Sequence, residues 1–206
     1  MGRKKKIVEE VVLKPSHYQE AIYDFVEHDV GNLVVEAAAG AGKTSTLLQI
    51  LRLLPSDKKV LFCAFNKDIV KEITKKVPKD ITNVDIRTVH SLGFLMIQRN
   101  LKGEEIIPNE NKYRQFIYNN LDEISIIDTT YMKYKDRMKY IDNICNLVDF
   151  ARFYLVNSEK EIEKLVDRYD VDIIADEVEA TIKVLEWGKT SINEIDFTDM
   201  IWLPYV

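Results

Sequence analysis

The sequence predicts an α/β fold in which helices flank a parallel sheet and a helical subdomain is inserted after it. Two observations lead to this fold class. Over residues 13–94, short apolar runs alternate with segments of helical periodicity, whereas residues 95–190 are helical in pattern almost throughout, with one proline and few glycines. Strands and helices that alternate at such lengths are typical of right-handed crossovers in a parallel sheet.

The first expected elements are a helix, a strand and a second helix. Ser16 stands where it can cap the first helix, whose apolar residues, such as Tyr18, Ile22 and Phe25, recur at helical spacing. The apolar residues 33–35 predict a buried strand. A leucine-rich segment then predicts a helix that runs up to Pro55.

Two further strands and the helix between them complete the first region. Residues 60–64 are apolar without interruption, as expected for a strand that is covered on both faces. Residues 68–77 have a helical pattern, and residues 84–88 predict another short strand. The order strand, helix, strand, helix, strand favours a parallel sheet.

A phosphate-binding loop is expected between the first strand and the second helix. The pattern G-x-x-x-x-G-K-[ST] is met by Gly42, Lys43 and Thr44, with Ala37 in place of the first glycine. Gly40 and Gly42 let the backbone approach phosphates, which then meet amide groups at the start of the helix. The residues expected to bind the nucleotide are Ala39, Gly40, Ala41, Gly42, Lys43, Thr44 and Ser45.

The chemistry of this loop assigns roles to two side chains. Lys43 is expected to reach the β- and γ-phosphates of ATP, and Thr44 to ligate Mg²⁺. Both are therefore candidate catalytic residues. A turn of small residues between a strand and a helix is the alternative, but such a turn does not require Lys and Thr directly after Gly.

Composition excludes several classes of protein. The chain has 206 residues, of which 46% are hydrophobic and 31% charged, as is ordinary for a soluble globular protein. The net charge of -5 argues against a uniformly basic nucleic-acid binder, so any contact with DNA must be local. Cys63 and Cys145 form no disulfide or metal pattern and are expected to be buried thiols in a reducing compartment. No run is long enough to span a membrane, and we expect a cytoplasmic protein.

The second region is expected to be a separate helical unit. An acid-rich stretch within it contains the apolar residues 173–175 followed by Asp176 and Glu177, as in a strand that ends in a magnesium-binding pair. We reject that interpretation, because the apolar run is short and Val178, Ile182 and Leu185 continue a helix. The basic residues 1–12 are expected to form a solubilising tail, although they could also contact DNA phosphates or act as a localisation signal.

Three further motifs accompany the loop in a fixed order. Residues 15–22 contain Gln19, residues 64–67 follow the second expected strand, and residues 88–94 follow the third. Together with the loop, these motifs resemble the amino-terminal part of the UvrD/Rep-type superfamily 1 DNA helicases. The resemblance covers nearly the whole chain and is strongest over residues 13–94. It implies a RecA-like motor domain, termed 1A, and a helical insertion, termed 1B, over residues 95–190, with residues 191–206 returning to 1A.

The resemblance also implies roles for individual residues. Gln19 would read the adenine edge, for which an amide offers a donor and an acceptor side by side. The other two motifs resemble those that touch single-stranded DNA at the carboxyl edge of the sheet. Phe65 would stack on a base, and the remaining DNA contacts would come from Asn66, Lys67, Thr88, His90 and Ser91.

The resemblance further implies what the chain lacks. In the family, a strand that ends in Asp-Glu follows the return segment, and a second motor domain supplies arginines to the γ-phosphate. The chain stops at Val206, before either of them. We therefore expect an ATP-binding piece of a 3′-to-5′ helicase of DNA replication or repair, with negligible hydrolysis and no unwinding of its own. Its partners would be single-stranded DNA and the remainder of the helicase, and loss of the next strand would leave residues 33–35 as an open edge.

Two other functions fit part of the pattern. The chain could be a non-enzymatic module that binds single-stranded DNA or a helicase partner, with the nucleotide as a structural ligand. A small phosphate-loop kinase is less attractive, because the sequence has no cluster of arginines suited to a lid over the phosphates.

Overall fold

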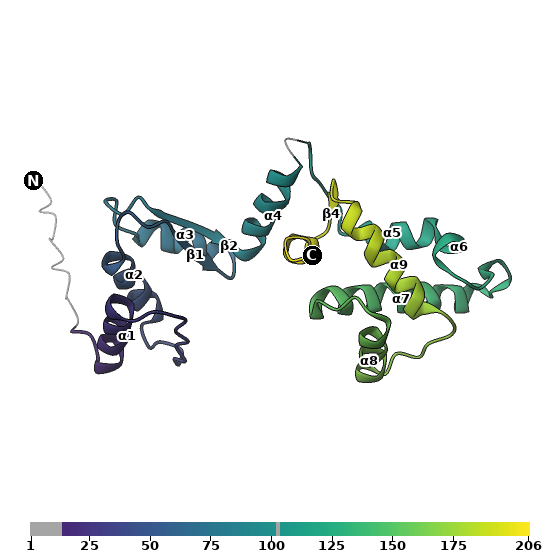
Figure 1. Cartoon of the computed structure of the whole chain (residues 1–206), viewed down its shortest axis with the longest axis horizontal. Helices are drawn as coiled ribbons and strands as arrows, with labels where there is room; N and C mark the ends of the chain where they lie inside the picture. Colours follow the sequence, from purple (N-terminus) through teal and green to yellow (C-terminus); the bar gives the residue numbers. More distant parts are fainter. Residues whose placement is uncertain (1–13, 102–103) are drawn as a thin grey trace, which may run out of the picture. The chain divides into compact units, whose positions relative to one another are not determined.

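A computed structural model describes residues 14–101 and 104–206 (Figure 1). The chain divides into two compact units, Met1–Arg87 and Thr88–Val206. The predicted basic tail of residues 1–12 lies outside the described residues. Within the described part, no helix is long and apolar enough to cross a bilayer.

The first unit begins with two helices that pack on each other. Helix α1, His17–His28, starts with a capping box, in which the Ser16 hydroxyl accepts from the Gln19 amide and the Gln19 side chain accepts from the Ser16 amide. Helix α2, Lys43–Leu53, follows the glycine-containing loop and contacts α1. Both helices were expected from the sequence, and Ser16 caps α1 as predicted.

The sheet of this unit has two strands, β1 (Val60–Ala64) and β2 (Val84–Thr88), joined through helix α3 (Lys67–Lys76). The amide of Val60 at the start of β1 donates to the carbonyl of Asn83, directly before β2, so the strands run in the same direction. Helix α3 packs against β1 (Figure 1). This parallel β-α-β crossover confirms the α/β class and the strands predicted at residues 60–64 and 84–88.

Two predictions about the sheet are wrong. Residues 33–35 form no strand, and Val34 is 92% exposed. An apolar run becomes a strand only when a neighbour accepts its hydrogen bonds, and this segment pairs with neither β1 nor β2. Strand β1 is also not covered on both faces, because Leu61 and Cys63 are exposed. The expected open edge at residues 33–35 therefore does not form, and Cys63 is not a buried thiol.

The second unit is mainly helical, as predicted. Its long helices are α4 (Val89–Asn100), α5 (Lys112–Asn119), α7 (Tyr134–Tyr154), α8 (Glu159–Tyr169) and α9 (Glu177–Thr190). The short elements are α6 (Leu121–Ile124), η1 (Thr129–Tyr131), α10 (Asp199–Trp202) and the parallel strands β3 (Ile107–Pro108) and β4 (Glu194–Ile195). One hydrophobic core joins α5, α6, α7, α8, α9 and α10, with Ile144, Leu147 and Val184 fully buried.

The pair Asp176 and Glu177 belongs to this helical unit and to no strand. Asp176 accepts hydrogen bonds from the Tyr140 hydroxyl and the Ile126 amide. Glu177 is the first residue of α9 and accepts from the amides of Ile174 and Ala175 and from Asn143. These two carboxylates therefore fix a loop to the start of a helix, which confirms that the segment does not form the strand rejected above.

The two cysteines should differ strongly in reactivity. Cys63 is exposed on β1, whereas burial raises the pKa of the half-buried Cys145 thiol to about 11. Because only the thiolate is alkylated, we expect iodoacetamide at pH 8 to modify Cys63 about a hundredfold faster than Cys145. Peptide mass spectrometry over time checks this, with Cys63→Ser as the control that should leave almost no early adduct. Equal rates at the two thiols would contradict the prediction.

Candidate nucleotide and nucleic-acid site

The glycines of the predicted phosphate loop adopt backbone conformations that other residues rarely reach. Gly40 and Gly42 have φ values of 79° and 78°, in the left-handed region. Gly42 is the N-cap of α2 and offers no side chain to the first amides of that helix. Those amides therefore remain available to an anion at the positive end of the helix dipole.

The Lys43 side chain reaches back to the start of the loop. Its ammonium donates hydrogen bonds to the carbonyls of Ala37 and Ala38, at 2.8 and 2.9 Å. The lysine is otherwise exposed, so the ammonium can exchange these carbonyls for phosphate oxygens without leaving the loop. The loop thus has a positive charge at its centre before any ligand binds.

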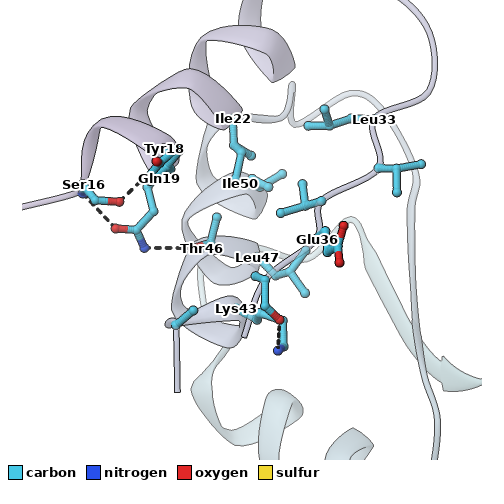
Figure 2. A pocket seen from close by; sticks show the side chains of 14 residues that line it. Ser16, Tyr18, Gln19, Ile22, Leu33, Glu36, Lys43, Thr46, Leu47 and Ile50 are labelled. Carbon is cyan, nitrogen blue, oxygen red and sulfur yellow. Dashed lines mark hydrogen bonds between the residues drawn. The ribbon is translucent and has the colours of Figure 1, made fainter. Parts of the chain in front are cut away.

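A cavity of about 650 Å³ adjoins the loop and falls within the size range of small-molecule sites. Figure 2 shows Ile22 of α1, Leu33 of the preceding segment, and Leu47 and Ile50 of α2 around it. The polar atoms at its rim come from Gln19, Glu36 and Lys43 among others. An apolar cavity beside a cationic loop suits a ligand with an apolar part and an anionic part.

Gln19 connects α1 to the loop. Its side-chain nitrogen donates to the Thr46 hydroxyl at 2.9 Å (Figure 2). That hydroxyl donates to the Gly42 carbonyl at 3.1 Å. The Gln19 side-chain oxygen already accepts from the Ser16 amide. One amide hydrogen and one lone pair of Gln19 therefore remain for a ligand. Thr46 was not predicted, because its position in α2 belongs to no motif.

The other predicted nucleotide residues follow one another through the loop and the first turn of α2. Ala41 lines the cavity together with Lys43. Ala39 and Gly40 lie in the exposed turn, and Thr44 and Ser45 follow Lys43 in the helix, with Thr44 half-buried. Of the predicted nucleotide residues, Gln19, Ala41 and Lys43 line the cavity, and the others lie in the loop and the first turn of α2 that adjoin it.

The first predicted DNA motif lies at the carboxyl end of β1. Phe65 directly follows the strand and is 88% exposed, and Lys67 is an exposed residue at the start of α3. Asn66 has a defined structural role, since its side-chain oxygen accepts from the Ile69 amide at 2.9 Å and caps α3. The Phe65 ring is therefore open to solvent, as a base-stacking side chain must be.

Removal of the Asn66 cap should lower stability measurably. We expect Asn66→Ala to decrease the free energy of unfolding of the first unit by about 1 kcal/mol, because the Ile69 amide loses its acceptor. Asn66→Asp keeps an acceptor and should remain near wild type. Urea unfolding followed by circular dichroism measures both variants, and an alanine variant as stable as the aspartate variant would show that the cap contributes nothing.

The second predicted DNA motif forms the start of α4. Thr88 is buried, and its hydroxyl accepts from the Ser91 amide at 3.1 Å, while the Ser91 hydroxyl donates to the Thr88 carbonyl. The His90 ring stacks on Phe197 with centroids 3.7 Å apart and planes 19° apart. Burial lowers the pKa of His90. Phe197 is half-exposed, and no role was predicted for it beyond its place in the return segment.

Comparison with known families identifies the chain. A family model described as UvrD/REP helicase N-terminal domain matches residues 19–206. The chain belongs to this helicase family. The match begins at Gln19 and includes the loop and every residue named above as a candidate for binding. A search of curated proteins found no match.

This UvrD/REP-type chain also contains a buried ionic cluster that sequence reasoning missed. Lys112 of α5 and Arg152 of α7 meet Asp196 and Asp199 of the return segment, and all four side chains are nearly or fully buried. Burial raises the pKa of Asp196, although Arg152 acts in the opposite direction. Burial lowers the pKa of Lys112, whereas the charge of Asp199 raises it. Unlike the motifs, these residues are far apart in the sequence and carry no local pattern.

Proposed function

We propose that this chain is the ATP-binding part of a 3′-to-5′ DNA helicase motor, with a RecA-like 1A domain over residues 13–94, the 1B insertion over residues 95–190 and a return to 1A over residues 191–206. The observation that carries the proposal is the loop of residues 37–43, whose central ammonium and free helix amides adjoin an apolar cavity. The family match supports it.

In this proposal each part of the site binds a different part of ATP. The base occupies the apolar cavity beside the remaining hydrogen-bonding groups of Gln19. The phosphates replace the Ala37 and Ala38 carbonyls as partners of Lys43 and accept from the amides at the start of α2. The described residues contain no group of three or more His, Cys, Asp or Glu side chains that could hold a metal. In the proposal, Mg²⁺ would bind through Thr44 and the phosphates, whose charge it would neutralise.

We further propose that these residues bind ATP without hydrolysing it. The sequence contains two Asp-Glu pairs, at residues 122–123 and 176–177. The first lies in α6, and the second begins α9 and is held by Asn143 and Tyr140. Neither pair follows a strand of the sheet. Neither of these two pairs is therefore placed to orient water at the γ-phosphate.

We assign single-stranded DNA as the second ligand. Phe65 and the ring pair of His90 and Phe197 would stack on bases, and Lys67 would contact a phosphate. Asn66, Thr88 and Ser91 would shape the two DNA-binding turns through their caps. Stacking contributes roughly 1–3 kcal/mol per base and accepts any sequence, as a motor that moves along DNA in replication or repair requires.

Two binding measurements on the chain test the proposal. Calorimetry with ATP and Mg²⁺ should detect binding, and fluorescence anisotropy with a labelled oligothymidylate should detect single-strand binding that weakens as salt rises. Absence of ATP binding by folded protein would refute the nucleotide proposal. Binding of DNA without ATP binding would instead support a non-enzymatic DNA-binding module.

A further inference from the structure

The segment that carries Phe197 is a turn closed by its own aspartates. The Asp199 amide donates to the Asp196 side chain at 2.7 Å, and the Asp196 amide donates to the Asp199 side chain at 3.3 Å. Two reciprocal hydrogen bonds thus fix the conformation of residues 196–199, as in a capping box. Phe197 lies inside this turn, with its ring half-exposed and stacked on His90.

Two cations from the helical insertion hold this turn. One terminal nitrogen of Arg152 donates to Asp196 at 2.7 Å and to Asp199 at 2.9 Å. Lys112 donates to Asp199 at 2.7 Å and to the Ser191 carbonyl at 2.8 Å, and the Tyr113 hydroxyl donates to Asp199 at 2.7 Å. Arg152 also lies over the Tyr113 ring, 3.8 Å from its centroid.

Burial of these charges has a consequence for geometry. Asp199 is fully buried and Arg152 is 2% exposed, so each needs its partners in defined positions. Removing one member of such a buried pair leaves an uncompensated charge and is strongly destabilising. The turn that presents Phe197 can therefore move only if the cluster is broken.

We infer that Arg152 and Lys112 are positioning residues for single-strand binding, because they fix residues 196–199 so that Phe197 remains stacked on His90. This inference rests on the proposed DNA-binding function. The helical insertion then contributes to the DNA site through its buried ionic cluster, even though neither cation contacts the DNA.

Two readouts on the full chain test the inference. The first is affinity for a labelled oligothymidylate. The second is the NMR shift of the His90 ring protons, which the ring current of a stacked Phe197 displaces, and which can be resolved because the chain has three histidines. We expect Arg152→Met to lower the affinity at least fivefold and to move the His90 protons toward the shifts of an unstacked histidine.

The matched control is Arg114→Met. Arg114 of α5 pairs with Asp142 of α7 at 2.8 Å, so it joins the same two helices as the buried cluster, but its pair is half-exposed. This variant should change neither readout. If Arg152→Met does not fold, the charge-balanced double variant Arg152→Met with Asp196→Asn removes one charge of each sign and should show the same two changes.

The outcomes separate this inference from the function on which it rests. A folded Arg152 variant with wild-type affinity and wild-type His90 shifts overturns the positioning role, and so does failure of both Arg152 variants to fold. Phe197→Ala and His90→Ala test the DNA contact itself. If they bind DNA as tightly as wild type, the proposed contact fails, and a role for Arg152 in DNA binding fails with it, whatever the His90 shifts show.

Discussion

Lys43→Ala is expected to abolish measurable binding of ATP with Mg²⁺. The variant loses the ammonium that donates to the carbonyls of the loop, and charge-assisted bonds to phosphate are about twice as strong as neutral ones. Loss of two such bonds, at roughly 1.5–3 kcal/mol each, predicts a decrease in affinity of at least a hundredfold. Isothermal titration calorimetry at matched protein concentrations measures it.

The control for this prediction is another lysine of the same unit. Lys71 of α3 pairs with Asp68 on an exposed surface, and Lys71→Ala should bind ATP like wild type. Circular dichroism must show that both variants are folded, because Lys43 also ties the loop together in the absence of ligand. Affinity of Lys43→Ala within threefold of wild type would refute the role assigned to the loop.

Gly93→Ala should strongly destabilise the helical unit. A Cβ atom on Gly93 would lie 1.5 Å from the Met200 carbonyl oxygen, which is backbone of α10 and cannot rotate away. The two helices must separate, at a cost of about 3 kcal/mol or more, since overpacking of a tight contact typically costs 1–3 kcal/mol even when side chains can adjust. Urea unfolding should show a lower midpoint.

The same helix provides the control. Gln98 of α4 is exposed, and Gln98→Ala should leave the midpoint within experimental error or raise it slightly, because alanine has the higher helix propensity. A Gly93 variant as stable as the Gln98 variant would mean that α4 and α10 do not approach as closely as the structure shows. Because Gly93 lies in the same helix as His90, the destabilised variant should also bind single-stranded DNA more weakly.

The fold was predictable where its determinants are local. The bounds of β2 agree with residues 84–88, and Ser16 caps α1, because turn chemistry and periodicity are properties of short segments. The prediction of a strand at residues 33–35 is wrong because an apolar run does not specify which strand it would pair with. The same cause explains Cys63, since an uninterrupted apolar run does not show whether a second layer covers the strand.

The residues of the candidate site were likewise predictable only where they belong to local motifs. Lys43, Thr44 and Gln19 belong to contiguous motifs and could be recognised from the sequence. Thr46 could not, because its hydroxyl acquires a role only when α1 packs against α2. Arg152 and Asp199 are separated by 47 residues and meet only in the folded chain. Long-range contacts of this kind have no signature in a single sequence.

The uneven distribution of buried apolar residues has a consequence for unfolding. Nearly all fully buried side chains lie in α5 to α10, whereas the first unit buries Leu51, Ala64 and Ile73 and exposes much of β1. Amide hydrogens of the first unit should therefore exchange with deuterium long before those of α7 and α9, and heating should give two transitions. A single melting temperature would describe the helices and not the part of the chain that carries the glycine loop.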